Sequence, residues 1–174
     1  MHQLSMAAIG QDRPGIVASV TRVLFEQGCN LADCSMTVLS GQFAMILLLD
    51  ARDDLSLDDL HQALEPVGAQ LGLSILVSDA SGSDGHPPQR PYVISLYGAD
   101  HPGIVYRVAA ELASRQINVT DLMSRVVGDN VYTVVLDVDL PGDLDAEEAG
   151  GELRALAAEV GVELTFRQAE IDPL

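Results

Sequence analysis

The stretch Gly10–Val17 reads GQDRPGIV, and the stretch Gly98–Val105 reads GADHPGIV. The two stretches lie 88 positions apart and share Gly, Asp, Pro-Gly and Ile-Val at equivalent positions. The correspondence continues beyond them, at Asn30 and Asn118, Asp33 and Asp121, and, after one extra residue in the second copy, Asp50 and Asp139. A period of this size is that of a small domain rather than of a solenoid repeat. The sequence therefore predicts two copies of one domain.

The segment between the copies has the composition of a linker. Residues 79–90 read DASGSDGHPPQR, with Gly, Ser, Asp and Pro dominant and no apolar period. Such clusters separate folded segments and rarely form regular structure. We expect a first domain over residues 1–78, a linker over 79–90 and a second domain over 91–174.

The spacing of apolar residues predicts the same order of elements in both copies. Alternation predicts a strand, and apolar residues every three or four positions predict a helix. The first copy is expected to have strands at 3–9, 29–38, 43–50 and 73–77, with helices over 16–24 and 57–71. The second is expected to have strands at 92–97, 117–127, 131–140 and 162–167, with helices over 102–115 and 145–160. This βαββαβ order predicts an α+β fold of ferredoxin-like type, in which each four-stranded antiparallel sheet carries two helices on one face. The unbroken apolar run Met45–Leu49 predicts a strand covered on both faces, as expected if the bare sheet face or edge meets another domain.

The charge of the chain excludes several classes of partner. The 174 residues include 9 Arg, no Lys and 26 acidic residues, which gives a formal net charge of −17. Nucleic-acid binding depends on cations that neutralise phosphates, so direct contact with DNA, RNA or an anionic membrane is not expected. Solubility or a salt-adapted source also accounts for the acidity. Without an apolar run of the roughly 20 residues that a membrane span needs, and without a signal peptide, the protein is expected to be cytoplasmic.

The repeated stretch has the chemistry of a strand-to-helix junction. Gly10 allows a close backbone approach or a positive φ, and Asp12 is placed to cap the following helix. Pro14 suits the first helical turn, where a backbone N–H is not needed. The amides around Pro14–Val17 would then provide donors for a carboxylate. Asp12, Asn30 or Asp33 would supply acceptors for an ammonium group, so the niche would suit a zwitterionic amino acid. The same residues also suit a plain helix cap and tight turn.

The order of elements, the GxDxPGIV stretch and the following Asn-x-x-Asp resemble the ACT domain, a small regulatory module that binds amino acids. A tandem pair without a catalytic domain is similar to the glycine cleavage system transcriptional repressor family. The resemblance covers nearly the whole chain outside the linker. It implies paired ACT units, within one chain or across a dimer, with a small amino acid bound at their interface. It also implies action on a DNA-binding activator rather than on DNA.

The resemblance implies ligand-binding residues at the junction and at the start of the second strand of each copy. In the first copy these are Asp12, Arg13, Pro14, Gly15, Ile16, Val17, Asn30, Leu31 and Asp33. In the second they are Asp100, His101, Pro102, Gly103, Ile104, Val105, Asn118, Val119 and Asp121. The copies differ at Arg13 and His101, so they need not bind the same ligand.

Other candidate sites are weaker. Cys29 and Cys34 are expected to be small buried residues without a disulfide. The acids at 53, 54, 58 and 59 are expected to precede and cap a helix rather than to bind a metal. Asp137 and Asp139 have the spacing of a phosphatase nucleophile pair, but only 35 residues follow Asp139 and the chain has no Lys. No catalytic residue, metal or cofactor is predicted.

These observations predict an amino-acid-sensing regulator rather than an enzyme. Glycine or serine is the ligand that the resemblance implies, and the partner would be a transcription activator or a metabolic enzyme. A homo-oligomer is expected. Two alternatives remain: a detached regulatory subunit of an amino-acid biosynthetic enzyme, and a ligand-free dimer module.

Overall fold

The computed structural model describes residues 1–82, 90–128 and 131–169. It divides into two compact units, with the boundary between Asp84 and Gly85. Most of the predicted linker, including His86, lies outside the described residues. The first unit contains β1 (His2–Gln11), α1 (Ile16–Glu26), β2 (Asn30–Leu39), β3 (Gln42–Ala51), α2 (Leu57–Leu71) and β4 (Leu73–Asp79). The second contains β5 (Pro91–Ala99), α3 (Ile104–Ser114), β6 (Asn118–Val127), β7 (Val131–Asp139), α4 (Ala146–Glu159) and β8 (Val162–Gln168).

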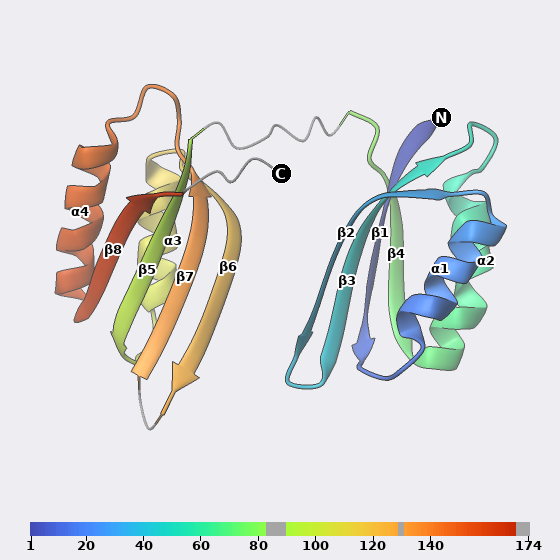
Figure 1. Ribbon diagram of the computed structural model, residues 1–174, viewed down its shortest axis with the longest axis horizontal. Helices are drawn as coiled ribbons and strands as arrows, with labels where there is room; N and C mark the ends of the chain where they lie inside the picture. The colour runs from blue at the N-terminus through green and yellow to red at the C-terminus, as the bar shows by residue number, and fades with distance from the viewer. Residues whose placement is uncertain (83–89, 129–130, 170–174) are drawn as a thin grey trace. The chain divides into compact units, whose positions relative to one another are not determined.

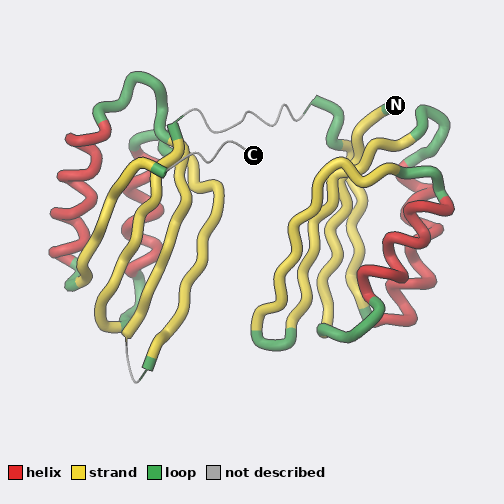
Figure 2. Tube along the Cα trace, in the orientation of Figure 1, coloured by secondary structure: helices red, strands yellow, loops and turns green. Residues whose placement is uncertain are grey.

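Each unit is a two-layer α+β fold, which confirms the predicted βαββαβ arrangement. The strand order is β2-β3-β1-β4 in the first sheet and β6-β7-β5-β8 in the second, and all neighbouring strands are antiparallel. In each unit both helices lie on the same face of the sheet (Figures 1 and 2). No helix in the described part of the chain is long and apolar enough to cross a membrane.

The cores are aliphatic and lie between each sheet and its helices. Side chains of β1 and β3 alternate, so that Met45, Leu47 and Leu49 are buried against α1 and α2. Ile46, on the opposite face, is 61% exposed. Within the unit both helices pack on one face only, so the expectation that another domain covers the second face of this strand stays a prediction.

The ends of the helices differ from the predicted ones. The helix expected over 102–115 is α3, which begins later, at Ile104, because Gly103 is its N-cap. In α4, Leu153 is buried together with Ala149 and Ala157, whereas Leu156 is only half-buried. Asp58 and Asp59 lie in the first turn of α2, whose N-cap is Ser56.

Gly10 is required by a close approach between strands. It pairs with Phe43 on one side and with Leu73 on the other. A Cβ at this position would lie 2.7 Å from the Gly72 carbonyl oxygen and 2.8 Å from Leu73 Cδ2. Gly98 meets Val162 in the same way, with a Cβ distance of 2.7 Å to Cγ1. The absence of a side chain at this glycine therefore allows the start of the last strand of each unit to lie close to the first strand.

The two cysteines do not share one environment. Cys29 is half-buried and packs against the first core, whereas Cys34 is exposed on the edge strand β2. The prediction that both are buried is thus wrong for Cys34, because the helices do not cover β2. Burial raises the pKa of the Cys29 thiol, and the nearby positive charge of Arg52 opposes this effect.

We expect iodoacetamide to alkylate Cys34 before Cys29 at pH 8, because only the thiolate reacts and both burial and the raised pKa reduce the thiolate at Cys29. Peptide mass spectrometry at successive times checks the order, and the variants Cys29→Ser and Cys34→Ser give the two single rates. Equal rates in the folded chain would contradict the described burial.

Arg90 fixes the loop between β7 and α4. Its backbone N–H donates to Asp139 Oδ1 at 2.7 Å. Its guanidinium Nη1 donates to the carbonyl oxygens of Pro141 and Leu144, both at 2.8 Å. One side chain thus satisfies two loop carbonyls, a role that its position at the end of the linker does not suggest.

We expect Arg90→Ala to destabilise the second unit by about 1–2 kcal/mol, because charge-assisted hydrogen bonds to the loop carbonyls are lost. Arg107→Ala is the matched control, since Arg107 is exposed and forms one ion pair, with Glu159 at 3.3 Å. Hydrogen exchange of β7 and α4 amides at increasing urea measures the effect in the full chain. Equal losses of unfolding free energy in the two variants would show that the Arg90 contacts do not stabilise the second unit.

Candidate ligand-binding site

The N-termini of α1 and α3 have no side-chain cap. The N-cap residues are Gly15 and Gly103, with φ values of 93° and 97°, in the left-handed region that favours glycine. Apart from neighbouring residues of the chain, no heavy atom lies within 4 Å of where a Cβ would be at either glycine. The first amides of both helices are therefore left without a side-chain acceptor, beside open space. Such an end attracts a negative group.

The structure corrects two details of the predicted junction. Asp12 makes no capping bond to α1; its backbone N–H instead donates to the Gly41 carbonyl oxygen at 2.8 Å. Pro14 precedes the N-cap and so lies outside the first helical turn. The reason is the same in both cases: the left-handed Gly15 turns the chain into the helix and takes the N-cap position that Asp12 was expected to serve.

Arg13 and His101 lie near the C-terminal end of the second helix of their own unit. His101 Nε2 lies 2.6 Å from the carbonyl oxygen of Val160, the C-cap of α4, and forms a hydrogen bond with it. A Cβ built on Gly72, the C-cap of α2, would lie 3.9 Å from Arg13 Nη2. Both side chains therefore approach a helix end that carries partial negative charge. In the second unit, the His101 ring therefore already has a hydrogen-bond partner within the chain.

A β-bulge marks the start of the second strand in both units. The register shifts between Leu31 and Asp33 in β2, and between Val119 and Asp121 in β6. Asp33 accepts a hydrogen bond from the Cys34 amide at 2.7 Å, within the bulge region. The bulge places Asn30 opposite Asp50 and Asp33 opposite Leu48, so both lie on the sheet face that the helices leave uncovered.

Within one unit, the predicted residues at the start of the first helix lie far from those at the start of the second strand. Asn30 lies level with Asp50 and, through it, with Gln3, whereas α1 begins beyond Gln11 at the other end of β1. Eight residues of strand separate these levels, or about 26 Å at 3.3 Å per residue. The expectation of one niche within a copy is therefore wrong. The helix runs back along the sheet, so its start and the start of β2 lie at opposite ends (Figure 1).

In the second unit, Asn118 at the start of β6 lines an open hollow of about 400 Å³, together with the end of β7 and the loop that follows it. Its other lining residues are Gln116, Asp139, Leu140, Pro141 and Gly142. Sequence reasoning missed Gln116 and Asp139 as neighbours of Asn118. The repeat contained a signal for Asp139, since Asp50 is its counterpart and pairs with Asn30 as Asp139 pairs with Asn118.

Comparison with known proteins places the chain in a family. Models of the ACT domain match residues 2–78 and residues 92–158. The glycine cleavage system transcriptional repressor of Escherichia coli is 27% identical over 167 residues, which cover 93% of this chain and 87% of that protein. A UPF0237 protein of Methanopyrus kandleri is 41% identical over 78 residues, or 44% of this chain and 87% of its own length.

A solved structure shares the fold of both units. The crystal structure of an unknown protein from Galdieria sulphuraria matches with a TM-score of 0.83 and 26% identity, and covers 97% of this chain and 99% of that one. The match extends through both units, as does that of the repressor. The two family matches, the duplicated junction and the two βαββαβ sheets lead to one conclusion: the chain belongs to the ACT-domain family and carries two ACT domains in tandem.

Proposed function

We propose that the protein is a regulator that senses a small amino acid, with glycine or serine as the first candidates. The observation that carries the proposal is the pair of uncapped helix starts, at Gly15 and Gly103, each beside open space. A carboxylate there would accept hydrogen bonds from the first amides of the helix and interact with its positive end. The similarity to a transcriptional repressor over 93% of the chain supports a regulatory role.

The remainder of the site is proposed to come from a second copy of the chain. The end of β2 lies level with the start of α1, because Leu39 pairs with Gln42 and Gln42 with Gln11. If two β2 strands pair antiparallel, the start of one strand lies beside the end of the other. Asn30 of one copy would then approach the free helix start of the other. Its amide oxygen would accept from the ammonium group of the ligand.

The outer strand β2 has the exposed apolar surface that such pairing would bury. Leu31, Met36 and Val38 lie opposite the buried Leu49, Met45 and Phe43, on the helix side of the sheet. They are nevertheless 45%, 49% and 45% exposed. Side chains of this kind gain stability when a neighbouring chain covers them.

The signal is proposed to pass to a protein partner. With a net charge of −17 and no Lys, the chain is not expected to bind phosphates. A ligand that favours one arrangement of paired ACT domains would shift the population that the partner recognises. This mechanism uses binding alone and assigns no catalytic residue.

We expect glycine or serine to bind in a calorimetric titration with the twenty amino acids, at protein concentrations that detect Kd values of about a millimolar. Gly15→Ala should weaken binding in the first copy and Gly103→Ala in the second, because the left-handed φ strains any other residue. Gly151→Ala is the control, since Gly151 has no positive φ and its Cβ meets nothing within 4 Å. No heat with any amino acid would overturn the proposal.

We expect the ligand to strengthen self-association, which sedimentation velocity measures with and without it. Val38→Glu should abolish both the dimer and the ligand response, because it places a charge in the apolar row of β2. Gln70→Glu adds the same charge on the exposed surface of α2 and should change neither. A ligand-responsive dimer that survives in Val38→Glu would show that β2 is not the pairing edge.

A further inference from the structure

The sheet face that the helices leave uncovered in the first unit is apolar at its centre. Ile9 of β1, Ile46 of β3 and Leu76 of β4 are 56%, 61% and 65% exposed there. With small neighbours on the same strands, they border an open hollow of about 400 Å³. The side chains around this hollow are those of Ala7, Ile9, Ala44, Ile46, Ser74 and Leu76. None of the six is charged.

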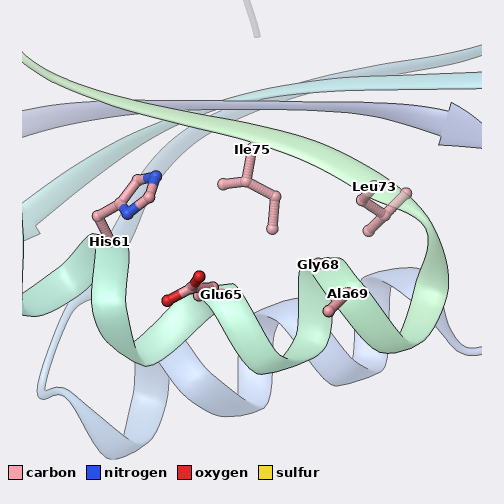
Figure 3. Close-up of a pocket in the computed structure, with 6 residues that line it drawn as sticks. All are labelled: His61, Glu65, Gly68, Ala69, Leu73 and Ile75. Carbon is pink, nitrogen blue, oxygen red and sulfur yellow. The ribbon is translucent and has the colours of Figure 1, made fainter.

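The helix side of β4 offers less space. The groove between β4 and α2 has a volume of about 170 Å³. Gly68 forms part of its wall, because a Cβ there would lie 3.2 Å from the Leu73 carbonyl oxygen. Figure 3 shows Ile75 pointing from the strand toward the helix. Since side chains alternate along a strand, Ser74 and Leu76 point to the uncovered face.

Large and small side chains alternate on this face both along and across the strands. Read across β4, β1 and β3, one row is large, small, large, and the next row is small, large, small. The first row is Leu76, Ala7 and Ile46, and the second is Ser74, Ile9 and Ala44. Each large side chain therefore has a small one two residues away on its own strand.

This pattern is complementary to itself under a two-fold rotation. Stacked sheets keep their strand directions within about 30° of each other, and their side chains interdigitate. An axis between two stacked copies, perpendicular to the strands and level with Ala8, places the first row of one copy over the second row of the other. Every large side chain of the six then lies over a small one, and each contact occurs twice. An axis parallel to the strands would instead stack Leu76 on Ile46.

The charge pattern also favours a second copy. Ser5 and Ser78 continue the face, with their hydroxyl oxygens 2.7 Å apart in a hydrogen bond. Contact between two such faces therefore brings no like charges together at its centre, although each chain has a net charge of −17. In the second unit, Glu163 takes the position of Ser74, so the equivalent face has a charge in its second row.

We propose that the uncovered face of the first sheet stacks on the same face of a second copy, about this two-fold axis. The contact would bury Ile9, Ile46 and Leu76. The net charge of −17 on each copy opposes it at low ionic strength. We therefore expect the contact to form in 1 M NaCl, where the Debye length is about 3 Å and this repulsion is screened.

The inference goes beyond the proposed function, because the contact needs neither an amino acid nor the β2 edge. Sheet stacking uses the face of the sheet, whereas β2 pairing extends its edge. One copy can therefore make both contacts, and two β2-paired dimers would form a tetramer. Failure of the stacking would leave amino-acid binding and β2 pairing unaffected, and the reverse also holds.

The test uses the full chain with Val38→Glu, which removes the proposed β2 contact, in 1 M NaCl without an amino acid. Sedimentation velocity over a concentration series gives the Kd of self-association, and we expect a monomer–dimer equilibrium. Adding Leu76→Glu places a charge in the stacked face and should weaken association about tenfold. Adding Thr165→Glu, at the equivalent exposed position of β8, should not change the Kd. A monomer at all concentrations, or equal Kd values in these two variants, would overturn the proposal.

A swap of side chains on β3 tests the two-fold arrangement, in the same Val38→Glu chain. Ala44→Ile would place a large side chain over Ile46 of the other copy, and Ile46→Ala would leave a small one over Ala44. Each change alone should weaken association about tenfold. The double variant restores large over small and should regain most of the lost affinity, while circular dichroism checks that each variant is folded. Folded variants in which the second change gives no recovery would overturn the proposed stacking.

Discussion

Packing of two helices on one face of a four-stranded sheet determines most of the other properties of this protein. The apolar stripes of α1 and α2 bury Leu4, Met6 and the inward side chains of β3, and α3 and α4 do the same in the second unit. A helix pair covers one face of such a sheet and leaves the other face and the outer strands exposed. The exposed apolar row of β2, the edge proposed for self-association, follows from this incomplete coverage.

Duplication gives the chain an internal comparison. The two units share the glycine approach at Gly10 and Gly98, the left-handed N-caps and the bulge at the start of the second strand. They differ where side chains face solvent or pack between a helix and the last strand. His101 bonds to the C-cap of α4, and Phe166 stacks on Tyr92 at the position that Val77 takes in the first unit. Shared features thus belong to the backbone, whereas the differences lie in side chains that decide which surfaces stay accessible.

The repeat and the apolar periods were sufficient to predict the fold, because strand and helix periods are local properties of the chain. The site was predicted less well. Asp12 and Pro14 were assigned helix-cap roles from residue preference, but the left-handed φ of Gly15 decides where the helix begins. The separation of Asn30 from Pro14 depends on strand register, which no local pattern contains. The groove beside Gly68 depends on contacts between α2 and β4, which no local pattern contains.

The position of Gly15 has a consequence for how a duplicated gene can evolve. The residue has a special backbone conformation but touches nothing, so a replacement there would strain only the first turn of α1 and leave the aliphatic core intact. Recognition and folding are therefore under separate selection in each copy. A change at one helix start can therefore alter the proposed ligand of that copy without loss of its fold.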